Sequence, residues 1–434
     1  MKTISVIISL IFFSQLVSGQ EQALDTLVKR FKYYRVNALQ EKMYAHLDRS
    51  FYLTGETLWF KVYTVDGTFH KPLNVSKVAY VEILDKANLP VLQAKIQLES
   101  GRGNGSFFLP ATLNSGNYRF RLYTNWMKNF SPEYFFSQDF TIVNPFVRLE
   151  PTQRETPLSY TADFFPEGGN MVAGLQNKIG FKITDSTGKG VSCTGYVLND
   201  KNDTVSTFRP TRFGIGHFLF TPAADTRYRV IVEDGQGKTS LHPFTEVHPS
   251  GYVLHLQDSG QYLRVHVTSQ SLQLPYVYLF VHARQLIAKA ELQTLRQNKA
   301  VFILNKNELP DGISHFTVFN EQLEPLCERL YFTYPEKLLG IDLKGNQPEY
   351  NYRKRVAVSI QTSNNSGTPL SANLSMSVFR IDSLPGNQPA GIFHHLWLNA
   401  DLAGTIESPE YYFRKSDPSA SQAMDDLMLT HGWR

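Results

Sequence analysis

The sequence predicts an all-β protein, a row of antiparallel β-sandwiches preceded by one short N-terminal helix. The first observation behind this prediction is a glycine-aromatic pattern that recurs 111 residues later, in Gly103, Gly105 and Phe107 and again in Gly214, Gly216 and Phe218. A partial third copy begins at Leu309-Pro310. The second observation is the alternation of apolar and polar residues in many short stretches. Repeats at domain-sized spacing indicate a row of similar β-domains, which usually bind, brace or span rather than catalyse.

The N-terminus has the features of a secretory signal peptide, which we expect over residues 1–19. Lys2 precedes an apolar run from Ile4 to Val17, and the small residues Ser18-Gly19 follow. The run is too short for a membrane helix, and no Cys stands near Gly19-Gln20 to carry a lipid anchor. The mature protein is therefore expected to be soluble and extracytoplasmic.

Length and composition indicate a globular chain of several domains. Removing the signal from the 434 residues leaves 415, enough for three or four domains. Hydrophobic residues make up 42% of the sequence and supply ample core material. Lys and Arg number 43 against 39 Asp and Glu, and the densest basic run, Arg353-Lys354-Arg355, introduces a strand. Nucleic-acid binding is therefore not expected.

The two cysteines, Cys193 and Cys327, fall in different repeats. A secreted protein stabilised by disulfides usually has more cysteines, in pairs. We expect two buried free thiols that pack as small apolar residues. A single inter-domain disulfide is the alternative.

Residues 20–41 are expected to form an amphipathic lead helix. The apolar residues follow steps of three and four: Leu24, Leu27, Val28, Phe31 and Tyr34. Two roles are open for this helix, a lid packed on the first sandwich or a helix that docks a partner.

Prolines and turn residues divide the rest of the chain into four blocks, at 42–146, 147–247, 248–336 and 337–434. Alternation of apolar and polar residues, as in Leu58–Tyr63 and Tyr118–Tyr123, predicts sandwiches with one buried face on each strand. The fourth block is expected to be an incomplete domain, with strands at Val356–Ile360 and Leu374–Val378 followed by loops and a helix near Ala423–Leu429. Met376 is expected to be a core residue.

Motifs that carry catalysis are absent from the sequence. It contains no nucleophile elbow, no helical His-Glu-x-x-His zinc site and no phosphate-binding loop. Gly101, Gly103 and Gly105 precede a strand, so turn geometry explains them better than phosphate binding. We therefore expect neither enzyme activity nor a cofactor.

Two polar clusters are candidate sites. His394 and His395 are adjacent with Asp401 nearby, but neighbouring side chains point apart, so an interface or turn histidine pair is expected rather than a metal site. The second cluster consists of His46, Asp48, Arg49 and Glu56. It is expected to form ion pairs or cap a turn at the start of the first sandwich, with ligand binding as the alternative. The stretch Phe164–Gly169 is expected to be an aromatic-anchored turn that opens the second domain.

The stretch from Glu41 to Lys61 resembles the opening of an MG2 domain, the macroglobulin-type sandwich of the α2-macroglobulin superfamily. Tyr52, Gly55, Glu56 and Phe60 stand where that motif places them. The chain is also similar to extracytoplasmic proteins of Bacteroidota-type bacteria that often join macroglobulin-like domains to a TonB-receptor-type plug domain. The stretches that carry this similarity are Tyr123–Met127, Phe164–Gly169, Cys327–Phe332, Asp401–Phe413 and Leu427–Arg434.

Two departures from that family limit what the resemblance implies. Neither Cys193 nor Cys327 begins the Cys-Gly-Glu-Gln thioester of protease-trapping macroglobulins, so covalent trapping is not expected. The sequence ends at Gly432-Trp433-Arg434, where similar proteins usually continue. We expect the plug-bearing half to be missing, through truncation, fragmentation or as a shorter natural product.

The resemblance implies tandem macroglobulin/immunoglobulin-like sandwiches that act as a non-enzymatic scaffold or binding arm, in the periplasm or associated with the outer membrane. The implied protein partner is an outer-membrane β-barrel transport or assembly complex. The alternative is an endopeptidase inhibitor that captures proteases without a thioester, with Asp382–His394 as the bait loop. The partner-binding residues that we expect are exposed aromatics near the first sandwich: Tyr52, Trp59 and Trp126.

Overall fold

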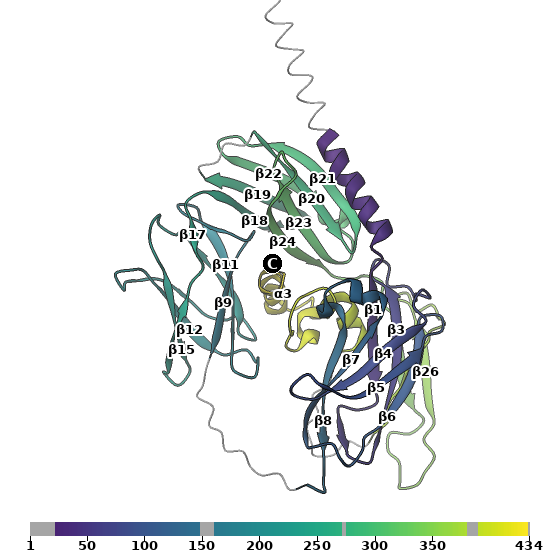
Figure 1. Cartoon of the computed structure of the whole chain (residues 1–434). Helices are drawn as coiled ribbons and strands as arrows, with labels where there is room; N and C mark the ends of the chain where they lie inside the picture. Colours follow the sequence, from purple (N-terminus) through teal and green to yellow (C-terminus); the bar gives the residue numbers. More distant parts are fainter. Residues whose placement is uncertain (1–21, 148–159, 271–274, 380–388, 433–434) are drawn as a thin grey trace, which may run out of the picture.

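The computed structural model describes residues 22–147, 160–270, 275–379 and 389–432. Three β-sandwiches stand around a C-terminal segment that occupies the centre (Figure 1). This arrangement confirms the all-β fold of tandem sandwiches with a short N-terminal helix. The predicted signal peptide lies outside the described residues.

The first sandwich packs a three-stranded sheet on a five-stranded sheet. The smaller sheet has the order β1-β3-β6, with β1 (Glu41–Leu47), β3 (Thr57–Asp66) and β6 (Arg102–Phe108). The larger sheet has the order β2-β8-β7-β4-β5, with β2 (Phe51–Leu53), β8 (Phe136–Val143), β7 (Gly116–Thr124), β4 (Val78–Leu84) and β5 (Pro90–Gln97). The short turns η1 (Trp126–Asn129) and η2 (Pro132–Tyr134) join β7 to β8. Buried aromatic rings fill the space between the sheets.

The second sandwich repeats this topology with fewer strands. Its sheets are β14-β11-β9 and β13-β12-β15-β16, with β9 (Thr161–Pro166), β11 (Asn177–Thr184), β12 (Cys193–Leu198), β13 (Thr204–Phe208), β14 (Ile215–Phe220), β15 (Arg229–Asp234) and β16 (Thr239–Pro243). Two short strands, β10 (Met171–Val172) and β17 (Val247–His248), pair in parallel beside it.

The third sandwich has the same order of strands as the second. Its sheets are β18-β19-β22 and β21-β20-β23-β24, with β18 (Gly251–Ser259), β19 (Tyr262–Gln270), β20 (Tyr276–Ala283), β21 (Leu286–Thr294), β22 (Lys299–Asn305), β23 (Gly312–Phe319) and β24 (Pro325–Thr333). The turn η3 (Lys306–Glu308) leads from β22 to β23. The three copies of the sequence pattern therefore correspond to three copies of one topology.

The repeated glycines have a packing reason. Gly105 on β6 pairs with Phe60 on β3, and Gly216 on β14 pairs with Phe181 on β11. A Cβ atom added to either glycine would lie 2.7 Å from the phenyl ring of its partner. Glycine therefore makes room for a large core ring on the adjacent strand in both repeats.

The lead helix forms over residues 22–37, but it packs on the third sandwich rather than as a lid on the first. Its Phe31 ring lies 5.0 Å from the Phe280 ring and 4.7 Å from the His282 ring, centroid to centroid. The segment just after the helix contacts the first sandwich, where Trp126 Nε1 donates to the Leu39 carbonyl at 2.7 Å. Phe31 belongs to the predicted apolar stripe. The stripe predicted a helix, but it could not show which sandwich the helix packs against.

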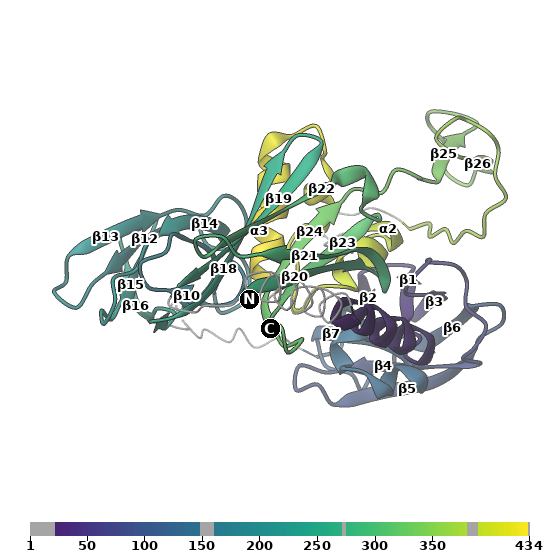
Figure 2. The ribbon, with the colours of Figure 1, turned by 90° about the horizontal axis from the view of Figure 1, so that it is seen from above.

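The fourth block forms a hairpin rather than a sandwich, with β25 (Gly340–Gly345) paired to β26 (Val358–Ser363). The strand expected at Leu374–Val378 does not form, and Met376, expected in the core, is 54% exposed. This segment lies against the first sandwich instead, where Lys61 Nζ donates to Asn373 Oδ1 at 2.6 Å. Alternation predicted a strand there, but no neighbouring strand pairs with it among the described residues. Figure 2 shows the hairpin standing clear of the sandwiches.

Two local predictions are confirmed. Cys193 and Cys327 are free and buried. The polar cluster at the start of the first sandwich is a capped turn: Asp48 Oδ1 accepts from the Trp59 N–H at 2.8 Å and from the Tyr52 hydroxyl at 2.7 Å. Arg49 pairs with Glu56 at 3.2 Å.

Candidate functional site

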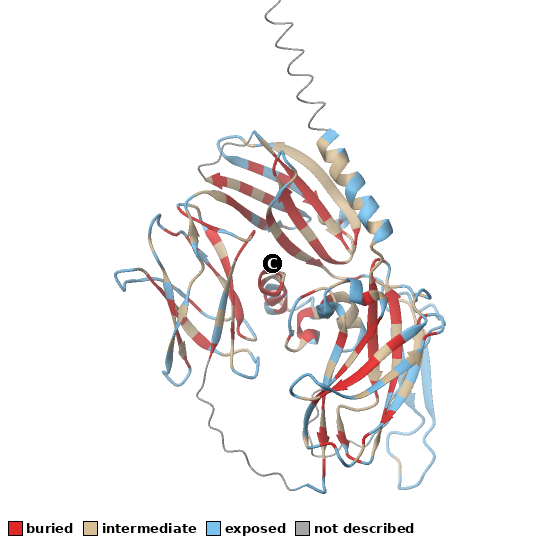
Figure 3. Ribbon diagram, in the orientation of Figure 1, coloured by how far each residue is buried: buried red, intermediate tan, exposed pale blue. Residues whose placement is uncertain are grey.

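The C-terminal segment, residues 389–432, packs against all three sandwiches and is the candidate functional site. It contains α2 (Ile392–His394), a π-turn η4 (His395–Asn399), a 3₁₀ turn η5 (Pro409–Phe413) and α3 (Pro418–Thr430). Figure 3 shows α3 as a largely buried helix at the centre, whereas the β25–β26 hairpin is exposed. One apolar core joins this segment to the second and third sandwiches through Ile215, Ile313, Leu330 and Phe332.

The sequence of α3 explains why a helix forms here. Asp417 caps its N-terminus by accepting from the Ser419 N–H at 2.9 Å, and Pro418 occupies the first helical position. Ala420, Ala423, Met424 and Leu427 recur at helical spacing and are buried, so a continuous apolar face meets the sheets. The helix near Ala423–Leu429 that the sequence predicted is confirmed, and it is longer at both ends.

A close approach brings α3 onto β11. A Cβ atom on Gly180 would lie 2.9 Å from the Cβ of Leu429, so only glycine leaves room for the helix at this distance. The helix also packs on β14 and on β24. It therefore fills the angle between the second and third sandwiches.

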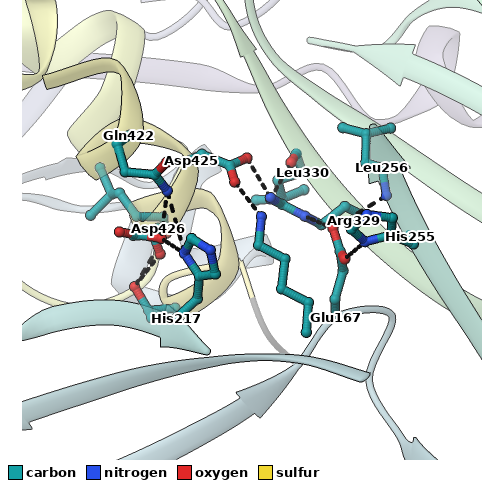
Figure 4. A network of polar contacts seen from close by, with 12 residues as sticks. Glu167, His217, His255, Leu256, Arg329, Leu330, Gln422, Asp425 and Asp426 are labelled. Carbon is teal, nitrogen blue, oxygen red and sulfur yellow. Dashed lines mark hydrogen bonds and ion pairs between the residues drawn. The ribbon is translucent and has the colours of Figure 1, made fainter. Parts of the chain in front are cut away.

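A buried network of charges surrounds Arg329 on β24, whose side chain is 2% exposed. Its Nε donates to Glu167 at 2.8 Å, and Nη2 donates to Asp425 of α3. Lys178 on β11 donates to the other oxygen of Asp425 at 2.6 Å, and His255 on β18 contacts Glu167 at 2.7 Å. Figure 4 shows Arg329 between Glu167 and Asp425. One guanidinium thus links the second sandwich, the third sandwich and α3.

The pKa shifts of these groups agree with full ionisation. Burial raises the pKa of Glu167 and of Asp425, but hydrogen bonds and the charges of Arg329, Lys178 and His255 outweigh burial, so both pKa values lie below the ordinary range. Burial lowers the pKa of Arg329, and the two carboxylates more than reverse that effect. Buried charges that neutralise one another fix geometry, because removing any partner leaves an uncompensated charge.

A second polar contact lies on the same helix. His217 Nδ1 on β14 contacts Asp426 Oδ1 at 2.5 Å, and Asp426 is fully buried. Gln422 Nε2, one turn earlier on α3, donates to the same oxygen at 3.3 Å. The side chains of Asp425 and Asp426 therefore reach to different sides of the helix and bind different strands.

The first sandwich meets the C-terminal segment at Lys42, a buried lysine on β1. Its Nζ donates to Asp401 at 2.7 Å and to the Leu396 carbonyl at 3.1 Å, and it contacts His70 Nε2 at 3.1 Å. Burial lowers the pKa of Lys42, and Asp401 opposes that shift. His395 Nε2 lies 2.8 Å from the Met43 carbonyl, so His395 is an interface histidine, as expected.

Two imidazoles at this junction are held neutral. Burial, followed by the charge of Lys42, lowers the pKa of His70 to about 3 and that of His395 to about 4. Arg284, in the turn between β20 and β21, donates to the Thr68 carbonyl at 2.7 Å and lies 4.7 Å from the centre of the Trp397 ring. The third sandwich therefore also contributes to this junction.

A groove of about 1200 Å³ runs beside α3 along the third sandwich. Tyr331, Tyr334 and several charged side chains line it. Its charges are largely paired with one another, as in Lys306 with Asp258 at 2.6 Å and Lys178 with Asp425. The groove could hold a polar ligand, but the paired charges mainly join neighbouring elements.

The predicted partner-binding aromatics do not form one surface. Tyr52 was expected to be exposed, but it is fully buried. Its ring lies in the core of the first sandwich, and its hydroxyl donates to Asp48 in the capped turn. Trp59 is 61% exposed on the outer face of β3. Trp126 is half-buried and holds the end of the lead helix. Of the three, only Trp59 is exposed enough to contact a partner fully.

Sequence reasoning did not identify Glu167 or Arg329 as residues that join the sandwiches, and it named Asp401 only as a neighbour of the histidine pair. Glu167 lies in the stretch Phe164–Gly169, Arg329 in Cys327–Phe332 and Asp401 in Asp401–Phe413. These stretches carried the family resemblance, and the structure brings them to two junctions. The sequence signal that could have identified these junction residues is a charged residue inside an otherwise apolar or glycine-rich stretch.

Metal ligation and thiol chemistry are two further properties of the described residues. They contain no group of three or more His, Cys, Asp or Glu side chains placed to hold a metal ion. Burial raises the pKa of Cys193 to about 11 and that of Cys327 to about 12, which keeps both thiols protonated and poorly nucleophilic at neutral pH. Within the same residues, no helix has the length and apolar character needed to cross a membrane.

Comparisons with known proteins give only distant similarities. No protein-family model and no curated protein matches the chain. Among solved structures, the chain is similar to a Salmonella alpha-2-macroglobulin variant, with 11% identity, a TM-score of 0.21, and coverage of 75% of this chain and 25% of that one. It is also similar to Escherichia coli alpha-2-macroglobulin activated by porcine elastase, with 11% identity, a TM-score of 0.25, and coverage of 76% and 34%.

A third similar structure is a tetra-tandem repeat from the extending region of a large adhesion protein, with 10% identity, a TM-score of 0.19, and coverage of 76% and 92%. The matched part of this chain thus spans a quarter to a third of the two alpha-2-macroglobulin chains. TM-scores this low do not support any inference about function. The class of the protein is therefore assigned from the sheets of this chain. The chain is a protein of tandem β-sandwiches held together by a C-terminal segment.

Proposed function

We propose that this chain is a non-catalytic, extracytoplasmic scaffold or binding arm of the macroglobulin-like type, associated with an outer-membrane transport or assembly complex. The observation that carries the proposal is the C-terminal segment, which holds three sandwiches in fixed relation through a shared apolar core and buried ion pairs. Such a body suits the presentation of surfaces at defined positions. The signal peptide predicted from the sequence and the family resemblance support the location.

An affinity pull-down from native envelopes with the mature chain tests this proposal. We expect recovery of an outer-membrane barrel or its accessory proteins, identified by mass spectrometry. Trp59→Ala should reduce recovery, because Trp59 is 61% exposed on the first sandwich. Tyr134→Ala removes another exposed aromatic, 47% exposed, and is the matched control. Recovery of no envelope protein by the intact chain would count against a scaffold for such a complex.

The alternative is an endopeptidase inhibitor that acts without a thioester. One observation favours it: the candidate bait loop Asp382–His394 ends in the C-terminal segment, so a cut there would separate that segment from the hairpin. Residues 382–388 lie outside the described part of the chain. The remainder is anchored, since the Tyr44 hydroxyl donates to the Ala390 carbonyl at 3.3 Å and Phe393 packs 5.0 Å from the Phe413 ring.

Incubation with several proteases separates the two functions. A bait loop predicts one preferred cut within Asp382–His394, followed by compaction and loss of activity of the protease toward large substrates. A scaffold predicts cuts at exposed segments outside Asp382–His394, such as the loop at Arg353-Lys354-Arg355, and an uninhibited protease.

A further inference from the structure

The β25–β26 hairpin is amphipathic and carries an apolar face that the described residues leave partly exposed. Leu343 pairs with Ile360 across the hairpin, and Gly345 pairs with Val358. Residues two apart share a face, so Ile341, Leu343, Val358 and Ile360 lie together. Ile341 and Leu343 are each 57% exposed, and Val358 and Ile360 are each 40% exposed. The opposite face is polar, with Asp342 and Lys344.

This hairpin is the part of the described chain where large exposed hydrophobic residues are most concentrated. Residues 338–379 also expose Tyr352, Val356, Met376 and Val378. Figure 2 shows the hairpin projecting from the sandwiches, with open space around it. Concentrated exposed apolar side chains mark an interaction surface.

The outer edge of β25 has backbone groups that can pair with another strand. Asn346 N donates to the Ala357 carbonyl, one step beyond the last paired residues of the hairpin. In an antiparallel pair the bonded positions alternate. The N–H and C=O groups of Ile341, Leu343 and Gly345 therefore point outward, away from β26. No other described strand pairs with β25.

The charge pattern of β25 is complementary to that of a second, antiparallel copy of β25. Asp342 and Lys344 flank Leu343 on the polar face, where they form an exposed ion pair with each other at 2.7 Å, with side chains 52% and 74% exposed. In an antiparallel pair of two β25 strands centred on Leu343, each Asp342 lies opposite Lys344 of the second copy. In this register, the outward-facing N–H and C=O groups of one β25 strand lie opposite the outward-facing groups of the second copy. A lone lysine on an edge strand repels its own copy, whereas this pattern attracts it.

We propose that two copies of this chain associate through antiparallel pairing of their β25 strands. The pairing joins two hairpins into one four-stranded sheet, with the two Leu343 side chains adjacent on its apolar face. Two symmetric Asp342–Lys344 pairs set the register on its polar face. The proposal goes beyond the proposed scaffold function, because it names a second copy of the chain as the partner of this hairpin.

Sedimentation equilibrium of the mature chain over a range of concentrations tests the proposal. The intact chain is expected to show a monomer–dimer equilibrium that weakens with salt. Asp342→Lys and Lys344→Asp, each alone, should weaken the dimer by about tenfold or more, because both cross-strand pairs become repulsive. An equimolar mixture of the two variants should restore association, since each variant then faces the opposite charges.

Matched controls carry the same charge changes elsewhere. Asp200→Lys and Lys201→Asp alter exposed residues of the turn between β12 and β13 and should leave the dimer unchanged. A monomeric intact chain at every concentration would overturn the proposal. It would also be overturned by a dimer that both single variants leave intact, or by a mixture that stays monomeric while circular dichroism shows both variants folded.

Discussion

Arg329 is 2% exposed, and its guanidinium is shared by Glu167 of the second sandwich and Asp425 of α3. Arg329→Ala removes the main counter-charge of the buried Glu167 carboxylate and of the partly exposed Asp425 carboxylate. We expect a loss of about 3–5 kcal/mol in the free energy of unfolding, measured by urea denaturation. Arg119→Ala is the control, because Arg119 pairs with Asp139 at the surface with 45% of its side chain exposed. That variant should lose about 0–1 kcal/mol, and an equal loss in both would contradict the role of the network.

His70 and His395 give the junction with the first sandwich a pH dependence. Their folded pKa values, about 3 and about 4, lie below the ordinary value of 6.5. Both are neutral in the folded state, whereas the unfolded chain binds protons below about pH 6.5. Stability is therefore unaffected above that pH and falls as the pH drops from about 6.5 towards 4.

The measurement is the melting temperature between pH 7.5 and 4.5. The double variant His70→Gln/His395→Gln should lose less stability than the unmodified chain across this interval. His248→Gln, on β17 of the second sandwich, is the control and should follow the unmodified chain. Parallel curves for the double variant and the unmodified chain would show that these two histidines do not cause the slope.

Helices and strands could be predicted where the local sequence pattern determines them. They were harder to predict where a strand forms only if another strand lies beside it. Alternation along β3 and β7 gives strands because each has a paired neighbour in its own sandwich. The same alternation at Leu374–Val378 gives no strand, since no neighbour pairs with it among the described residues. The amphipathic stripe of the lead helix was correct, but its partner, Phe280, lies far along the chain. The junctions of Arg329 and Lys42 depend on contacts between domains, which spacing in the sequence does not encode.

The α3 helix is the element on which the relative placement of the second and third sandwiches depends. Leu427 is fully buried in the core shared with both. Leu427→Ala should cost about 2–5 kcal/mol of stability through lost burial and a cavity. The sandwiches should also separate more readily, with a larger radius of gyration in small-angle X-ray scattering. Ser419→Asp, exposed in the first turn of α3, should change neither quantity. An unchanged radius together with an unchanged unfolding curve for Leu427→Ala would exclude this role for α3.

At the scale of the whole molecule, contacts between distant parts of the chain close the three sandwiches around the C-terminal segment. The lead helix lies on the third sandwich, and Gln285 of that sandwich donates to the Ala38 carbonyl at 3.0 Å, just after the helix. Lys42 binds the C-terminal segment at Asp401, and Arg329 binds it at Asp425. The short proline-bearing linkers expected from the sequence are therefore supplemented by direct packing between domains.

This closure predicts how the chain behaves after a cut. Arg353-Lys354-Arg355 lies in an exposed loop beside Tyr352, which is fully exposed, so trypsin should cut there early. The C-terminal fragment should remain bound to the rest, because α3 stays packed among the sandwiches and Asp401 stays paired with Lys42. Gel filtration should then give one peak with both fragments, which separate only in urea. In the Arg329→Ala variant the fragments should separate at a lower urea concentration. Release of the fragment from the unmodified chain in native buffer would mean that the covalent connection, rather than the buried network, holds the segment in place.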